Sequence, residues 1–462
     1  MDLRAKLARL RSMEPPAALF EPPPPPPAAA LRSVNVSDDV LGRALPVVDV
    51  TPSGARADRI AKLRALIGEV AARYERRTPP PPPAANEKPP WSEVLTAHGP
   101  LHVHERYLEP DHHHGRAAVR AGACERPAAL CALLRDPNFA AVDLTRALYL
   151  DTETTGLAGG TGTVAFLVGL ARFDDGVLCV EQLIVPQLGS ETPVLARLAE
   201  RIAAASCIVT YNGKSFDWPL LRTRFVLARL PVPELPPHID LLHVCRRVWK
   251  PRLPSLRLPD MEREVLCFER EDDLPGSEIP ARYFEFLRGG SPDRLVPVLE
   301  HNQNDLIALS ALLGAVLEHF DRARPLPHPR DALSFARLAL AAGDLASAEL
   351  FGDHALEHAE TESDRFAALT FRAALERQRG DTPRAIALLS SALGCAPGPE
   401  QRAAVHFKLA KLYEHEVGDL ARALAHARGT EPVEGPLLHG RRLGRLVRRL
   451  LRQDEAGSAG GT

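Results

Sequence analysis

Strand-like and helix-like runs alternate between residues 145 and 320, and this alternation leaves few folds open to that part of the chain. The predicted strands span residues 148–153, 164–173, 177–185 and 207–210. One predicted helix, residues 192–205, lies between the third and fourth strands, and another, residues 216–230, follows the fourth strand. The turn Asp174-Asp175-Gly176 predicts a hairpin between the second and third strands. The pattern therefore predicts an α/β domain over residues 145–322, a mixed sheet flanked by helices.

The regions on either side of this domain differ from it in composition. Proline runs at residues 22–27 and 79–83 favour extended conformations and cannot build a core. We therefore expect residues 1–90 to be a mostly disordered arm, with one amphipathic helix at residues 57–77. Residues 91–144 contain aromatic and histidine side chains and are expected to pack beside the α/β domain.

A repeat follows the α/β domain. The pairs Gly343-Asp344, Gly380-Asp381 and Gly418-Asp419 each separate two apolar helical runs, with a period in the upper thirties. This pattern looks like tetratricopeptide-type helical hairpins over residues 326–452, ahead of a disordered tail at residues 453–462.

The end of the repeat region is an amphipathic run rich in arginine. Its apolar residues are predicted to share one helical face, which would cap the array and leave the arginines solvated or bound to phosphate. These apolar residues are Leu443, Leu446, Val447, Leu450 and Leu451.

Composition narrows the setting of the protein. The formal net charge of the 462 residues is -2, so a nucleic-acid partner would be met by local patches rather than by a globally basic surface. The 7 cysteines are odd in number and form no C-x-x-C pair, which predicts reduced thiols in a cytoplasmic protein. No stretch approaches a continuous apolar span of membrane length, so neither secretion nor membrane insertion is expected.

The first predicted strand of the α/β domain ends in two carboxylates, Asp151 and Glu153. Side chains two apart on a strand lie on one face, so both acids are expected at the rim of the sheet. Such a pair repels itself unless a cation binds. Taken alone, this D-x-E would most simply be a polar strand end before a turn.

Two further acidic motifs follow in the same domain. Residues 211–221 read Y-N-G-K-S-F-D-W-P-L-L and place Asp217 in a first helical turn, where a negative charge is favoured. Residues 300–309 read E-H-N-Q-N-D-L-I-A-L, and His301 and Asp305 share one helical face because they are four apart. Each motif alone is also explained by a cap or a surface pair.

Taken in order, the D-x-E strand end, the N-x-x-x-F-D helix start and the H-x-x-x-D helix resemble the three exonuclease motifs of the DEDD superfamily of ribonuclease-H-like folds. The middle motif looks like that of the proofreading domains of B-family DNA polymerases. With the run D-T-E-T-T-G-L-A-G-G-T-G-T, the chain is most similar to the YprB-like family of predicted 3′-to-5′ exonucleases. The resemblance covers residues 148–320 and the helical repeats.

This resemblance implies a metal-dependent 3′-to-5′ exonuclease acting on single-stranded ends of DNA or RNA. It implies that oxygen ligands hold two divalent cations, Mg²⁺ or Mn²⁺, and that the two cations lie about 4 Å apart. The implied metal ligands are Asp151, Glu153, Asp217 and Asp305. His301 is implied as the general base, and Thr154, Asn212 and Phe216 as contacts to the terminal nucleotide. The helical repeats would recruit a protein partner or guide the strand.

Several residues keep two interpretations. Histidine-type members of the superfamily usually place four residues between the His and its Asp, whereas His301 shows the tyrosine-type spacing of three, so it could instead orient the water or the phosphate. Phe216 could belong to the core. Asp240 could support the site from behind or cap a helix. Residues 159–162 could approach a phosphate or form a plain loop. The triplet His112 to His114 is expected in a solvated loop rather than at a metal.

Two other functions remain open. A catalytically silent binding or scaffold protein would keep the fold and act through the repeats, but it would have no chemical reason to keep four carboxylates together. Endonucleolytic cleavage within a duplex is the other, and the superfamily-type positions of Asn212 and His301 argue against it.

Overall fold

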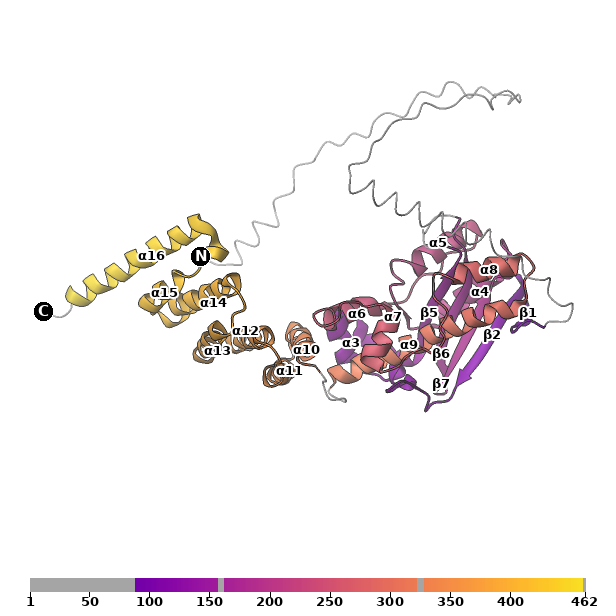
Figure 1. Cartoon of the computed structure of the whole chain (residues 1–462), viewed down its shortest axis with the longest axis horizontal. Coiled ribbons are helices and arrows are strands. Elements are labelled where there is room, and N and C mark those ends of the chain that lie inside the picture. The colour runs from indigo at the N-terminus through magenta and orange to yellow at the C-terminus, as the bar shows by residue number, and fades with distance from the viewer. Residues whose placement is uncertain (1–87, 157–161, 322–327, 460–462) are drawn as a thin grey trace, which may run out of the picture. The chain divides into compact units, whose positions relative to one another are not determined.

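A computed structural model describes residues 88–156, 162–321 and 328–459 of the chain, with side chains described up to residue 453. A seven-stranded mixed sheet with the order β1-β2-β7-β6-β5-β8-β9 lies at the centre of the first part (Figure 1). The strands are β1 (Ser92–Thr96), β2 (Gly99–Leu108), β5 (Ala147–Thr154), β6 (Ala165–Asp174), β7 (Val177–Ile184), β8 (Cys207–Thr210) and β9 (His238–Asp240).

The predicted hairpin between the second and third strands forms as β6 and β7. β5, β6 and β7 form an antiparallel series, and β8 and β9 add to it in parallel on the other side of β5. The β6–β7 turn places Asp175 and Gly176 at φ 46° and 84°, which is the left-handed backbone that a two-residue hairpin needs. The predicted fold class, a mixed sheet with flanking helices followed by a helical region, is confirmed.

Helices cover both faces of the sheet. Successive side chains of β5 point to opposite faces, and its first four residues are all buried, so each face needs a cover. Leu148 and Leu150 pack in one core with α4 (Thr192–Ala204), α5 (Asp217–Leu227) and α8 (Ile279–Leu287). Ala147 and Tyr149 pack in a second core, on the opposite face. The helices of that face are α3 (Pro127–Leu134), α6 (Leu241–Val248), α7 (Leu258–Met261) and α9 (Val296–Phe320).

Residues ahead of the predicted domain take part in the sheet itself. β2 pairs with β7 along its length, from His102 opposite Ile184 to Leu108 opposite Leu178. This is a closer association than the packing beside the domain that we expected for residues 91–144. One edge of the sheet is formed by β1, whose side chains are mostly exposed.

One member of the histidine triplet, His114, does not lie in a solvated loop. His114 belongs to the small hairpin of β3 (His113–His114) and β4 (Ala117–Ala118) and is 2% exposed. Its Nε2 lies 2.7 Å from Glu262 Oε1, and its ring stacks on Phe268 with centroids 3.8 Å apart. The prediction failed for His114 because its buried acidic partner is distant in sequence.

The second part of the structure is helical. Its helices are α10 (Pro329–Ala341), α11 (Leu345–Glu357), α12 (Glu362–Arg379), α13 (Thr382–Gly394), α14 (Pro399–Leu412), α15 (Leu420–Ala427) and α16 (Glu431–Ala459). They pack as the successive pairs α10/α11, α12/α13 and α14/α15. In each predicted Gly-Asp turn, the glycine has φ near +80° and the aspartate accepts a hydrogen bond from a backbone N–H of the next helix. The tetratricopeptide-like identity of these pairs stays a prediction.

The apolar face of α16 is narrower than predicted. Leu446 is buried and Leu443 and Leu450 pack partly against the same core, but Val447 is 41% and Leu451 56% exposed. Another side of the helix is held by ion pairs, since Glu414, in the short helical segment Tyr413–Val417 before α15, contacts arginines of α16. The residues of this cluster are Arg442, Arg445 and Arg449.

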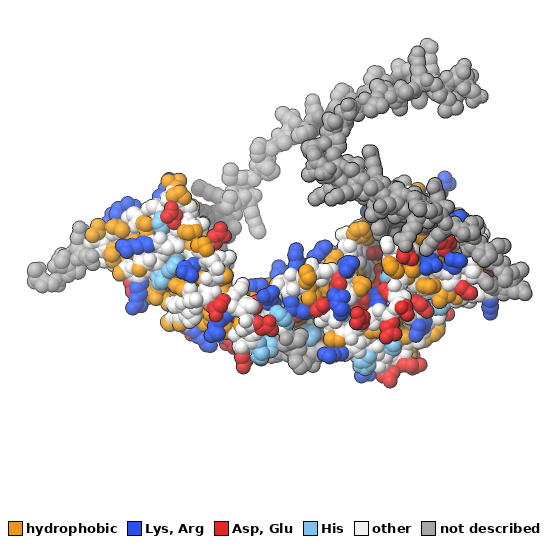
Figure 2. Space-filling view, viewed as in Figure 1, with side chains coloured by type: hydrophobic (Ala, Val, Ile, Leu, Met, Phe, Trp, Pro, Cys, Tyr) orange, Lys and Arg blue, Asp and Glu red, His pale blue; other side chains and the backbone are white. Residues whose placement is uncertain are grey.

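The surface carries both signs of charge. Lys and Arg side chains are interspersed with Asp and Glu side chains over the face shown in Figure 2. Within the described residues, no helix is both long and apolar enough to span a membrane. The helix predicted at residues 57–77 lies outside the described residues.

The close approach of α9 to β6 gives a test of this packing. A Cβ built on Gly169 would lie 2.1 Å from Asn302 Oδ1, so Gly169→Ala should lower the free energy of unfolding by about 2 kcal/mol. Thermal unfolding followed by circular dichroism measures this. Gly394→Ala is the control, because a Cβ there meets nothing within 4 Å and the position is helical. Equal stability of the two variants would contradict the packing described.

Candidate active site

Two carboxylates stand on one face of β5 at the end of its buried run. Asp151 and Glu153 are partly exposed and both face α9, as their spacing predicted. The pairing of β5 with β6 is irregular between Glu153 and Thr154. Such bulges re-aim side chains beside a site. The strand thus delivers both acids to one cleft.

Asp217 reaches the same cleft from the first turn of α5. Its side chain is 8% exposed, and Oδ1 accepts a 2.5 Å hydrogen bond from the Thr152 hydroxyl on β5. The loop before it is held by Asp240, whose oxygens accept from the backbone N–H groups of Asn212 and Lys214. Asp240 also caps α6 through the N–H of Leu242. Both interpretations of Asp240 thus have a geometric basis.

The third motif lies on α9. His301 and Asp305 are one turn apart, with Nε2 and Oδ2 separated by 3.7 Å. Between them, Asn302 donates a 2.9 Å hydrogen bond to Asp151 Oδ2 and accepts one of 2.9 Å from Gln182 on β7. Asn302 and Gln182 are fully buried. This amide pair ties the helix to two strands and fixes one acid of the site.

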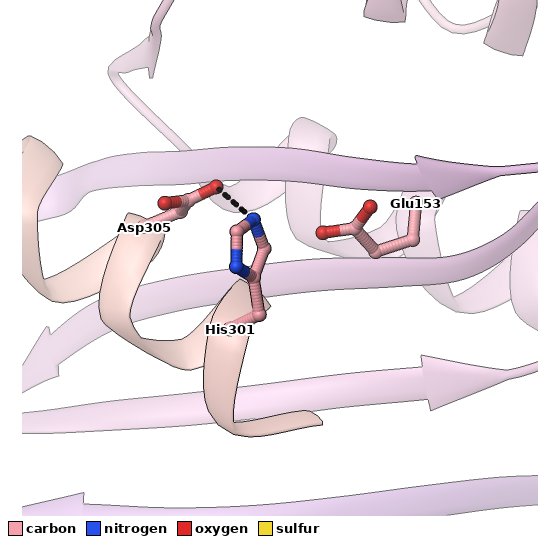
Figure 3. Close-up of side chains that lie close together, drawn as sticks. All are labelled: Glu153, His301 and Asp305. Carbon is pink, nitrogen blue, oxygen red and sulfur yellow. Dashed lines mark ion pairs between the residues drawn. The ribbon is translucent and has the colours of Figure 1, made fainter. Parts of the chain in front are cut away.

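Glu153, His301 and Asp305 form a cluster of side chains that could hold a metal ion. One ligand atom from each lies within 4.8 Å of the others, and the side chains point toward one another from β5 and α9 (Figure 3). Carboxylate oxygens suit hard divalent cations such as Mg²⁺ and Mn²⁺. The donor set therefore fits a divalent cation, with Asp151 and Asp217 close enough to add their charge.

The acids disfavour each other's charge. Burial, followed by the charges of Asp305 and Asp217, raises the pKa of Asp151 and of Glu153 well above their usual range. Burial also raises the pKa of Asp217 to about 6, although the hydrogen bond from Thr152 opposes this shift. A bound cation would remove the repulsion and favour the ionised forms.

A buried arginine, Arg270, places a positive charge next to this cluster of acids. Arg270 is 5% exposed at its side chain and contacts three carboxylates. Its guanidinium lies 2.5 Å from Asp305 Oδ1, 3.1 Å from Asp273 Oδ2 and 2.8 Å from Glu262 Oε2. Sequence reasoning missed Arg270, Asp273 and Glu262, because they lie outside the three motifs in an irregular segment with no periodic signal.

The cleft beside the acids is open to a substrate. Its volume is about 330 Å³. Phe216 lies on its wall with 61% of its surface exposed, so the alternative placement of Phe216 in the core is wrong. The other residues that line the cleft include Asp151, Glu153, Thr154, Asn212 and Asp217. Residues 159–161 of the glycine-rich run lie outside the described residues.

A hollow of greater volume lies elsewhere. It measures about 540 Å³ between α3 and the α10–α11 pair and is lined mainly by small and apolar residues. None of the acids described above lines it. The smaller cleft, which is lined by acids, is therefore the better candidate for an active site.

Residues 148–317 match the RNase_H superfamily. "Uncharacterized protein YprB" of Bacillus subtilis (strain 168) is 42% identical over 166 residues, which make up 36% of this chain and 40% of that protein. The match thus spans about two-fifths of the relative's length. The sheet and its flanking helices thus form a ribonuclease-H-like domain.

The raised pKa of Asp217 predicts how stability changes with pH in a chelator. With a pKa of about 6 in the folded protein and 3.8 ordinarily, Asp217 binds more protons in the folded state between these values. The free energy of unfolding should therefore fall as pH rises through this window, by about 2 kcal/mol from this group. Thermal melts in chelator at pH 4 to 7 measure the decline.

Divalent cation added at pH 7 should restore the lost stability, because it neutralises the ionised cluster. Asp217→Asn is the control: its stability should fall less as pH rises, because only Asp151 and Glu153 still contribute to the decline, and added cation should restore less stability than in the wild type. A stability that rises from pH 4 to 6 in both proteins would contradict the electrostatic description.

Proposed function

We propose that the protein is a metal-dependent 3′-to-5′ exonuclease that hydrolyses phosphodiester bonds at single-stranded ends of DNA or RNA. The observation that carries the proposal is that Asp151, Glu153 and Asp217 line one open cleft of a ribonuclease-H-like domain, with Asp305 close enough for its charge to act on Asp151 and Glu153. Four carboxylates from three separate elements have no structural need to meet, since each raises the cost of ionising the others.

In this proposal the four acids hold two divalent cations, Mg²⁺ or Mn²⁺. When bound, such ions activate water and neutralise the charge on the leaving oxygen. The residues of the chain carry the remaining tasks. Asp151 is kept in place by Asn302, and Asp217 by Thr152, so two of the acids enter the cleft already oriented.

His301 takes the proton of the attacking water at Nε2. The water oxygen bonds to phosphorus, the bond from phosphorus to the 3′ oxygen of the preceding nucleotide breaks, and that oxygen leaves to take a proton. A neutral imidazole suits this task near pH 7. The His301 side chain is 14% exposed, so part of the ring is open to water while most of it is shielded.

The wall of the cleft is suited to the end of a strand. Phe216 offers an exposed ring on which a base can stack. Asn212 has a left-handed backbone, φ 65°, held through its N–H by Asp240, and Thr154 contributes a hydroxyl. We propose that Asn212, Phe216 and Thr154 seat the terminal nucleotide, and that Asp240 keeps this wall in place.

The helical pairs are proposed to hold a protein partner or to guide the strand. They contain no part of the acid cluster. A catalytically silent scaffold acting through these helices is the competing function. It predicts that the protein itself has no nuclease activity, so that replacing the acids changes nothing.

Activity tests decide between these functions. Purified protein with Mg²⁺ or Mn²⁺ should shorten 5′-labelled single-stranded DNA or RNA from its 3′ end, and Asp151→Asn should lower the rate about 100-fold or more. Asp175→Asn is the matched control, since Asp175 is an exposed turn residue of the same domain whose left-handed backbone asparagine tolerates.

Circular single-stranded substrates should stay intact, because they offer no end. Cleavage of circles would overturn the exonuclease proposal in favour of an endonuclease. Intact linear strands with every metal tested, or equal rates for the wild type and Asp151→Asn, would instead support the scaffold.

A further inference from the structure

The segment between α7 and α8 carries two charged residues that reach the acid cluster without belonging to any of its three motifs. Arg270 and Asp273 are three apart, and they contact each other through a guanidinium nitrogen and Oδ2 at 3.1 Å. Arg270 also contacts Asp305, which is proposed to hold metal. Asp273 also contacts His301, which is proposed to accept a proton. Their joint position therefore bears on how these two groups are aligned.

The contact of Asp273 with His301 fixes which ring nitrogen faces the acids. Asp273 Oδ1 lies 2.8 Å from His301 Nδ1. An ionised carboxylate can only accept, so Nδ1 carries the proton and a neutral imidazole keeps its lone pair on Nε2. Nε2 is the nitrogen that lies 3.7 Å from Asp305 Oδ2, too far for a hydrogen bond but on the side of the cluster.

Arg270 sets the position of Asp273 relative to Asp305. Its planar guanidinium donates to both carboxylates, at 3.1 Å and 2.5 Å, and such a fork holds its partners in a fixed geometry. Behind it, Glu262 receives a third contact at 2.8 Å and is itself held by His114. The guanidinium is thus anchored from the protein interior and cannot turn toward a substrate.

Asp273 is not positioned to be a metal ligand itself. Its Oδ1 is taken by His301 and its Oδ2 by Arg270. Arg270 has three carboxylate partners and 5% exposure, so it is not a direct contact for the substrate phosphate either.

We propose that Arg270 and Asp273 are positioning residues: Asp273 orients the His301 ring so that Nε2 faces the attacking water, and Arg270 holds Asp273 and Asp305 in register. This rests on the proposed function in that His301 is the proton acceptor.

A double-mutant cycle tests the proposal in the full-length chain. Asp273→Asn should lower kcat about 100-fold with KM for the strand nearly unchanged, because general base catalysis is lost and binding is not. In the His301→Ala background, the same Asp273→Asn change should have no further effect, since Asp273 acts only through His301. Additive losses in the double variant would overturn the proposal.

Metal binding separates this role from ligation. Titration of Mn²⁺ alone, followed by electron paramagnetic resonance, should give Asp273→Asn an affinity close to that of the wild type. A loss of about 10- to 100-fold would indicate that His301 ligates the metal and that Asp273 supports the ligand, which would overturn the proton-acceptor assignment.

Nitrogen NMR gives a readout that does not depend on nuclease activity. In protein labelled with ¹⁵N-histidine, the His301 signals, assigned by their absence in His301→Gln, should show a proton on Nδ1 in the wild type and a tautomer mixture in Asp273→Asn. An unchanged tautomer would overturn the orienting role. If the wild type cleaves no strand, the proposed function fails while this measurement still decides the geometry.

Two further variants complete the design. Asp272→Asn is the matched control, because Asp272 is the exposed neighbour of Asp273 and its left-handed backbone, φ 51°, tolerates asparagine. It should match the wild type in every measurement. Arg270→Lys keeps the charge but loses the fork, so its kcat should fall as in Asp273→Asn; wild-type kcat in a folded Arg270→Lys would refute the role of the fork.

Discussion

The repulsion between carboxylates that the fold brings into one cleft is the constraint on which the rest of the site depends. Asp151, Glu153 and Asp217 each have a raised pKa, with burial as the first cause, so the folded chain resists ionising all of them together. Arg270 offsets part of this charge from within the protein. A divalent cation would offset the remainder, which is why a cluster costly for stability is well suited to hold metal.

Two of the acids, Asp151 and Asp217, are held in place by neutral groups. Asn302 and Gln182 connect Asp151 to β7, and Thr152 holds Asp217. These groups carry no charge, so they orient the carboxylates without competing for a cation. The result is a site whose geometry is set before any ligand enters, on strands and helices rather than on a flexible loop.

The sequence outlined the sheet well because its strands are local signals. Four strands formed close to their predicted bounds, since buried apolar runs and the Asp175-Gly176 turn specify them within a few residues. The same reasoning failed for His114 and for the outer apolar residues of α16. Their environments are decided by distant partners or by the angle at which a helix packs, and no local pattern reports either.

By itself, the sequence determined the α/β order, the shared face of Asp151 and Glu153, and the separation of His301 and Asp305 by one helical turn. These follow from the fixed periods of strands and helices. Only the tertiary structure decided that Arg270 and Asp273 join the cluster, that Asn302 clamps Asp151, and that β2 extends the sheet. Such contacts join residues from 28 to 151 positions apart, and their existence depends on how separate elements pack.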